Sequence, residues 1–153
     1  MFFDNFQLQL FLQVLLAAFL GALIGLEREY KRKEAGLKTF SLVSFGACFF
    51  TIVGVYLGSP QGYLSSFVSV DPVRIIQAVA IGIGFIGSGL IIFQKFQVEG
   101  LTTAATLWAS AAIGIGVGVG LYFLSIIGAF LVLGILSFFR LIEEKAFHKK
   151  QKD

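Results

Sequence analysis

The residues Gly82-Ile-Gly-Phe-Ile-Gly87 spell G-x-G-x-x-G, the pattern that binds a dinucleotide pyrophosphate where a strand meets a helix. Here the motif lies inside the apolar stretch AVAIGIGFIGSGLIIF, with no strand before it and no acidic residue about 20 positions later to hold a ribose. These surroundings exclude a dinucleotide site. Glycines in an apolar helix instead predict a surface on which a neighbouring helix packs closely. The glycines assigned to helix packing are Gly21, Gly25, Gly82, Gly84, Gly87, Gly89 and Gly114.

Polar residues at the start of the same apolar run are candidates for a binding site, because ionisable groups near hydrocarbon are energetically unfavourable. Asp71 is followed by proline, which predicts a helix N-cap and first helical position. Arg74 and Gln77 follow in steps of three, and Gln77 shares a helix face with Gly84 and Ser88. That face could line a polar crevice. In the structural alternative Asp71 only caps the helix, Arg74 reaches lipid headgroups and Gln77 bonds a neighbouring helix.

A second group of candidates lies at the other ends of the apolar runs. Glu27, Arg28 and Glu29 directly follow a helix face of small residues, and Thr103 and Thr106 lie on one stripe of a later helix. The structural alternatives are an interfacial charge cluster and threonines that bond the carbonyls of their own helix. Both segments are expected on the same face of the membrane, where they could form one site.

The sequence brings no nucleophile, base and orienting group together, so we expect no enzymatic activity and no catalytic residue. Cys48 lies in the middle of an apolar run and is interpreted as a packing residue. His148 stands alone in a lysine-rich tail, and no cluster has metal-ligand spacing, so neither a metal site nor a cofactor is expected. The basic segments flank apolar runs, which favours topology signals over nucleic-acid binding.

The elements that position these residues are predicted to be membrane-spanning helices. The chain is 57% hydrophobic and 14% charged, with a mean hydropathy of +0.88, whereas soluble domains are about 25% charged. Five apolar runs have the length needed to cross hydrocarbon. They predict one all-α domain over residues 1–153, a bundle of five transmembrane helices, with a turn near 116–120. The predicted helices are about 6–26, 40–57, 73–93, 101–119 and 121–142.

The distribution of basic residues predicts the orientation of this bundle. All but one of the 12 Lys and Arg residues fall between the first two runs, between the third and fourth, or at and beyond the end of the fifth. Five spans place these three segments on one face, which the positive-inside rule assigns to the cytoplasm. The amino terminus and the loop 58–72 are then expected outside, with Arg74 as the basic residue at that edge. The residues before the first run lack the features of a cleaved signal, so the first helix is expected to be retained.

Three segments resemble the membrane domain of the MgtC/SapB family of bacterial inner-membrane proteins. They are GALIGLEREYKRKEAGLKTFSLVSFGA at 21–47, DPVRIIQAVAIGIGFIGSGLII at 71–92 and GLTTAATLWASAAIGIGVGVGLY at 100–122. The resemblance covers about 21–122 in colinear order. It implies a five-helix protein of the bacterial cell membrane with a role in adaptation to low magnesium. For the best-known member it also implies restraint of the F-type ATP synthase.

Two features depart from the family pattern. Many members continue into a cytoplasmic domain, which is not expected here because the residues after Arg140 are too few to build a core. The family usually shows AGLRT where this chain has lysine at position 38. Lysine presents a point charge, whereas arginine presents a planar fork that binds a partner through two bonds.

Two hypotheses for function follow. The first is a regulatory protein that contacts another membrane complex, such as the F-type ATP synthase, or a further copy of itself. The second is a small transporter or channel for an ion, magnesium being the first to consider; it is weakened because no acidic residue lies inside any apolar run, and magnesium prefers oxygen ligands. The candidate functional residues are Glu27, Arg28, Glu29, Lys38, Thr39, Asp71, Arg74, Gln77, Thr102, Thr103, Thr106 and Trp108.

Overall fold

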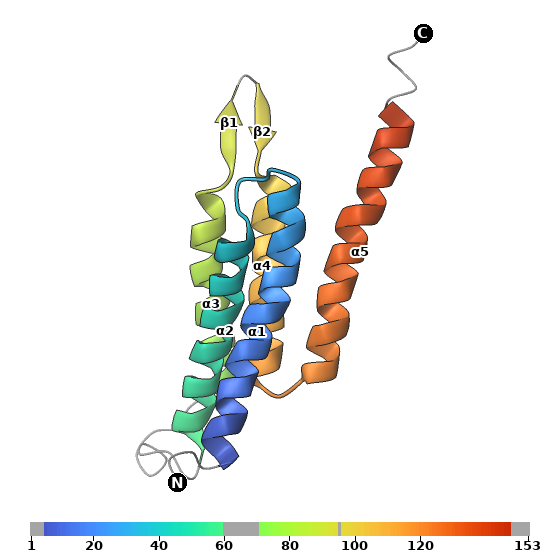
Figure 1. The fold of residues 1–153 in the computed structure, drawn as a ribbon. Helices are drawn as coiled ribbons and strands as arrows, with labels where there is room; N and C mark the ends of the chain where they lie inside the picture. Colours follow the sequence, from blue (N-terminus) through green and yellow to red (C-terminus); the bar gives the residue numbers. More distant parts are fainter. Residues whose placement is uncertain (1–4, 60–70, 95, 148–153) are drawn as a thin grey trace.

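The described part of the chain forms a bundle of five antiparallel helices (Figure 1). The computed structural model describes residues 5–59, 71–94 and 96–147. The start of α1 and the end of α5 lie at opposite ends of the bundle, as expected for an odd number of spans. The predicted all-α membrane fold is therefore confirmed. The helices are α1 (Asn5–Tyr30), α2 (Leu37–Gly58), α3 (Pro72–Ser88), α4 (Leu101–Gly118) and α5 (Tyr122–Phe147).

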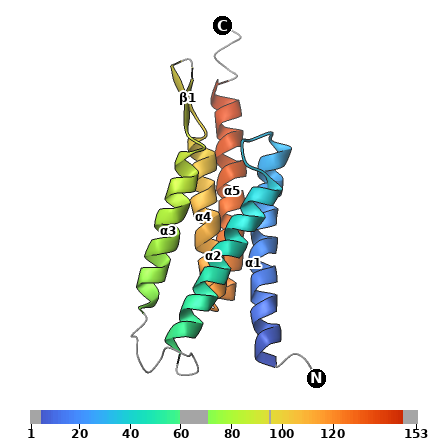
Figure 2. The same ribbon diagram turned by 90° about the vertical axis from the view of Figure 1, so that its left-hand side faces the viewer.

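Helices α1, α2 and α4 form the core of the bundle. Each packs against the other two, while α3 packs on α2 and α4, and α5 packs on α4 and α1. Figure 2 shows α2 between α3 and α1. Buried residues recur at steps of three and four along α1, as at Ala17, Leu20 and Ile24, and they meet Phe40 of α2 and Leu107 of α4. This stripe is what an amphipathic helix needs to bury one face.

Three of the predicted packing glycines lie at the closest approaches of the core. A Cβ atom on Gly21 would contact the Phe40 carbonyl oxygen and lie 2.8 Å from Ser44 Cβ, and one on Gly25 would lie 2.7 Å from Leu37 Cα. On α4, a Cβ on Gly114 would overlap the Ser44 carbonyl. Small residues at these positions let α1 and α4 approach α2 backbone to backbone, as membrane helices commonly do.

The third helix is shorter than predicted. It ends at Ser88 instead of residue 93, and the following residues form a hairpin of β1 (Ile92–Gln94) and β2 (Gln97–Glu99). Hydropathy alone does not mark this end, because the apolar run continues into the first strand. Four of the helices are long and apolar enough to span a membrane on length and composition, and α3 is a shorter apolar helix.

The hairpin returns the chain to α4 through a glycine that no other residue could replace without strain. Gly100 has φ 82°, and a Cβ there would overlap the carbonyl oxygen of Leu90. Phe96 is also in the left-handed region, with φ 64°, at the tip of the hairpin. The hairpin lies at the same end of the bundle as the connection 31–36 and the end of α5 (Figure 1).

The turn between α4 and α5 lies where the sequence predicts it. Helix α4 ends at Gly118, and Gly120, with φ 86°, reverses the chain before α5 begins at Tyr122. Helix α5 diverges from the other four toward its carboxyl end (Figure 1). Most of the predicted loop 58–72, Lys95 and the tail from residue 148 lie outside the described residues.

Candidate functional site

The predicted charge cluster at the end of α1 closes the connection to α2. Glu29 accepts a hydrogen bond from the backbone N–H of Leu37 at 2.8 Å, so its carboxylate caps the first turn of α2. A Cβ on Gly36 would lie 2.6 Å from the same carboxylate oxygen. Glycine at position 36 therefore leaves room for this cap.

Arg28 and Glu27 form an ion pair in the same cluster. Arg28 Nε lies 2.6 Å from Glu27 Oε2, and the two side chains are 5% and 15% exposed. The second carboxylate oxygen of Glu27 is buried and has no hydrogen-bond partner in the described structure. A buried guanidinium next to a carboxylate is held in a defined orientation, because the alternative would leave an unpaired charge inside the protein.

Glu34 ties the connection 31–36 to α4. The hydroxyl of Thr103 donates a hydrogen bond to Glu34 Oε2 at 2.6 Å. This bond, with a bond from the Glu34 backbone and the positive charges of Lys33 and Arg28, holds the pKa of the Glu34 carboxyl below its ordinary value. We call Glu27, Arg28, Glu29, Glu34 and Thr103 the polar cluster. The two segments expected to share one face of the membrane thus meet at one end of the bundle.

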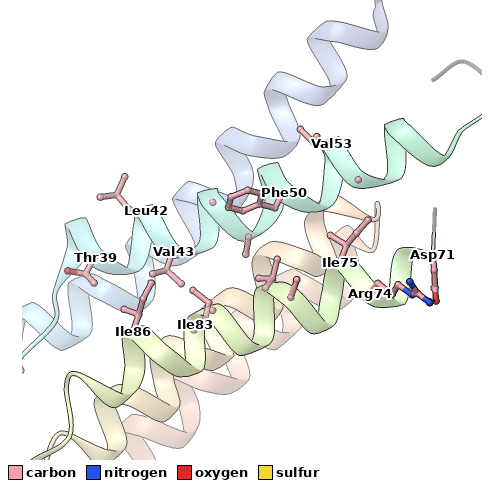
Figure 3. Close-up of a pocket in the computed structure, with 16 residues that line it drawn as sticks. Thr39, Leu42, Val43, Phe50, Val53, Asp71, Arg74, Ile75, Ile83 and Ile86 are labelled. Atoms are coloured by element: carbon pink, nitrogen blue, oxygen red, sulfur yellow. Dashed lines mark ion pairs between the residues drawn. The ribbon is translucent and has the colours of Figure 1, made fainter. Parts of the chain in front are cut away.

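A groove runs between α2 and α3 on another side of the molecule. Its volume is about 980 Å³, and apolar side chains such as Val43, Phe50 and Ile83 line most of it (Figure 3). Asp71 and Arg74 lie at one end and Thr39 lies toward the other. We call this cavity the α2–α3 groove. Its lining extends from Thr39 to Gly54 on α2 and from Asp71 to Ile86 on α3.

The glycines of the G-x-G-x-x-G motif are not in close helix contacts within the described structure. No atom lies within 4 Å of a Cβ built on Gly82 or Gly84, whereas one on Gly87 would lie 3.7 Å from Ala104 Cβ, an ordinary contact. A Cβ on Gly89 meets only the backbone of its own chain turn, at 3.3 Å from the Ile86 carbonyl oxygen. Gly82 lines the α2–α3 groove. A packing role for Gly82 and Gly84 therefore remains a prediction, and the helix that packs on them would belong to another molecule.

The helix face with Gln77, Gly84 and Ser88, expected to line a polar crevice, does not line the α2–α3 groove. Gln77 is exposed, and Ser88 bonds the Phe85 carbonyl of its own helix at 2.6 Å. Asp71 caps α3 as predicted, accepting a hydrogen bond from Val73 N at 2.9 Å. Arg74 lies 3.9 Å from the Asp71 carboxylate, and its side chain is 85% exposed at the end of the groove.

Comparison with known proteins decides the family. The MgtC family model matches residues 14–145. The chain belongs to the MgtC family. An uncharacterized protein of Haemophilus influenzae is 38% identical over 98% of this chain and 63% of its own length. The putative magnesium transporter YhiD of Escherichia coli K12 is 38% identical over 90% of this chain and 64% of its own, and Protein MgtC of Brucella abortus is 44% identical over 69% and 40%. No solved structure matches the chain.

Membership of the MgtC family and the apolar helices make this chain a multi-pass protein of the bacterial inner membrane. The chain spans about 63% of the length of the first of these relatives. The family match includes most of α1 and all of α2, α3 and α4, so both the polar cluster and the α2–α3 groove lie within it.

The remaining candidates of this MgtC-family chain are distributed over the surface and the helix backbone. Thr106 bonds the Thr102 carbonyl at 2.6 Å, which is the structural alternative for a membrane threonine. Trp108 and Lys38 are exposed on α4 and α2. Glu34 was not singled out from the sequence, since nothing in the order of residues shows that it reaches a threonine 69 positions away.

Proposed function

We propose that this MgtC-family chain is a regulatory membrane protein in adaptation to low magnesium, and that it acts by holding a helix of another membrane complex in the α2–α3 groove. The supporting observation is a groove of about 980 Å³ that the chain's own helices leave open along α3. The names of the relatives MgtC and YhiD connect the family with magnesium. The family resemblance makes the F-type ATP synthase the first complex to test as partner.

The walls of the groove suit a helix. Gly46 on α2 and Gly82 on α3 line it, and a Cβ on either would meet nothing within 4 Å. Between membrane helices the driving force is close packing and not exclusion of water, so a surface of small residues is where a second helix gains the most contact. A groove lined by Val43, Phe50 and Ile83 offers the dispersion contacts that the partner would make.

The sharpest test changes two glycines of the same motif. Gly82→Leu places a large side chain in the groove, whereas Gly84→Leu adds the same side chain two residues away, outside the groove lining. Both variants are expected to fold and reach the membrane. Gly82→Leu should lose complementation of growth at low magnesium and recovery of the partner in mild detergent, and Gly84→Leu should keep both. Equal behaviour of the two variants would reject the groove as the docking site.

The alternative function is a small ion transporter, favoured by the name of the relative YhiD, a putative magnesium transporter, and by the charged pair Asp71 and Arg74 at the end of the groove. A magnesium path is expected to present several oxygen ligands, and the groove is mostly apolar. Purified protein in liposomes separates the two functions. Specific magnesium flux by the protein alone would establish transport and overturn the regulatory proposal.

We also infer the orientation from charge, placing the polar cluster at the cytoplasmic side. Single cysteines at Ser59 and Lys145, in a Cys48→Ser background, lie at opposite ends of the bundle. Only the cysteine at Ser59 should react with an impermeant reagent added to intact cells. Labelling of Lys145→Cys from outside would contradict the inferred orientation and support the opposite one.

A further inference from the structure

A second cavity lies at the end of the bundle that holds the polar cluster. Its volume is about 390 Å³, and it is formed by the end of α1, the connection that follows it, the start of α4 and the second half of α5. Helix α5 diverges from the other helices at this end (Figure 1). We call this cavity the basic pocket.

Cationic side chains from separate segments converge on the basic pocket. They are Arg28, Lys31, Lys33 and Arg140, and no acidic residue is among the described residues that line it. Glu27 pairs with Arg28, and the charges of Lys33 and Arg28 act on Glu34. Like charges around a small volume repel one another, and an anion between them removes that repulsion.

Arg28 distinguishes the basic pocket from an ordinary basic flank of a membrane helix. Its side chain is only 5% exposed, and Glu27 holds its Nε at 2.6 Å. A side chain already fixed in place loses little freedom when a ligand binds. Basic residues that only signal topology act from exposed positions and need no such burial.

The remaining wall of the basic pocket is apolar. Ile135, Leu136 and Phe139 line it from α5, and Thr102 contributes from the first turn of α4. A ligand that carries both a negative charge and a hydrocarbon portion matches these two walls. Phosphate esters also match the donor set, since arginine, lysine and a hydroxyl are common phosphate partners.

We propose that the basic pocket binds the phosphate group of an anionic phosphate ester, with Arg28, Lys33 and Arg140 as its main charged contacts. Two sources supply this chemistry at a membrane surface, the headgroup of an anionic phospholipid and a free phosphate compound. Anionic lipid headgroups attract basic residues at the cytoplasmic surface. This site is independent of the α2–α3 groove, because none of its lining residues is shared with it.

The test uses the full chain purified in an uncharged detergent and freed of bound lipid. Three probes are titrated: dioctanoyl phosphatidylglycerol, dioctanoyl phosphatidylcholine of the same chain length, and inorganic phosphate. Binding is followed by the rise of the thermal unfolding midpoint and by calorimetric titration. Phosphatidylglycerol should bind saturably and more weakly at high salt, and phosphatidylcholine should not bind in this way.

The variants separate this pocket from the overall charge of the protein. Lys33→Gln and Arg140→Gln should each weaken the apparent affinity about fivefold, the effect of removing one cation near an anionic headgroup. Lys145→Gln removes the same charge from α5 outside the pocket and should leave the affinity unchanged. These positions are preferred to Arg28, whose loss would leave Glu27 without its ion-pair partner.

Each outcome decides the proposal. Binding of phosphatidylglycerol alone supports the site with a lipid headgroup as ligand, and binding of inorganic phosphate as well supports it with a free phosphate compound. Equal binding of phosphatidylcholine and phosphatidylglycerol, no saturable binding of any probe, or equal weakening by Lys145→Gln would overturn it.

Discussion

Two sets of helix glycines in this bundle have opposite surroundings. Gly21, Gly25 and Gly114 are pressed against the backbone of α2, whereas Gly82 and Gly84 on α3 have no atom within 4 Å of a built Cβ. Both sets consist of glycines spaced along apolar helices. A pattern of small residues therefore identifies a surface that permits close approach, but not whether the approaching helix belongs to the same chain.

The largest effect on stability is expected where a large side chain replaces a glycine that contacts the backbone of α2. Gly114→Leu would force α4 away from the Ser44 backbone of α2 and should destabilise the bundle by about 3 kcal/mol. Unfolding in detergent, followed by circular dichroism, measures the change. Gly134→Leu on α5 is the matched control, because a Cβ there meets nothing within 4 Å. Equal stability of both variants would contradict the distinction between glycines in close contact and glycines with open surroundings.

A smaller effect is expected from Gly36→Ala. The new Cβ would displace the Glu29 carboxylate and break its bond to Leu37 N, a loss of about 1 kcal/mol, as for other helix caps. The comparison is Gly46→Ala, which enters open space within a helix and should be neutral or slightly stabilising. Thermal unfolding of both variants in the same detergent tests this. If Gly36→Ala is as stable as Gly46→Ala, the cap contributes nothing.

Acid should weaken the polar cluster through Glu34. Because the folded state lowers the pKa of this carboxyl, its stabilisation is present above the ordinary value of 4.5 and is lost as the pH falls through the lowered pKa. The parent should therefore exceed Glu34→Gln in thermal stability at neutral pH, and the difference should shrink in acid. A difference that does not change with pH would show that the Thr103 bond does not depend on the charge.

The smallest effect on stability, with a large effect on function, is expected from changes of Arg74 at the start of α3. Arg74 is exposed, and its pairing with Asp71 is worth only about 0.2–0.5 kcal/mol. Arg74→Ala and Arg74→Lys should both reach the membrane at parental levels yet fail in growth at low magnesium, since lysine lacks the planar fork. Full growth of both variants would leave Arg74 a lipid-facing residue.

The sequence was sufficient for the helices because each must hide about 20 apolar residues in hydrocarbon. The five runs were predicted on that basis, whereas the turn near 116–120 was predicted from its glycines and the Asp71 cap from the proline that follows it. The predicted end of α3 was wrong, because Ile92 and Phe93 are as apolar in a strand as in a helix. The pairing of residues 92–94 with residues 97–99 distinguishes the two, and it does not show in hydropathy.

The candidate sites were less predictable, since they depend on contacts between distant segments. The same membrane face was inferred for Glu27 and Thr103 by counting spans, but the bond from Thr103 to Glu34 requires the path of the connection 31–36. The apolar α2–α3 groove was not predicted, because helix periodicity groups Gln77 with Ser88 without showing which face of α3 turns toward α2.

The short third helix gives the bundle helices of two clearly different lengths. With 17 residues, α3 is about 25 Å long, whereas the 26 residues of α1 extend about 39 Å. A bilayer with a hydrocarbon core of about 30 Å cannot match both, so lipid beside α3 must thin or the longer helices must tilt. The α2–α3 groove lies along this short helix. Hydrophobic mismatch there favours a partner helix with a short apolar span over a long one. The length of the partner's span therefore contributes to selectivity.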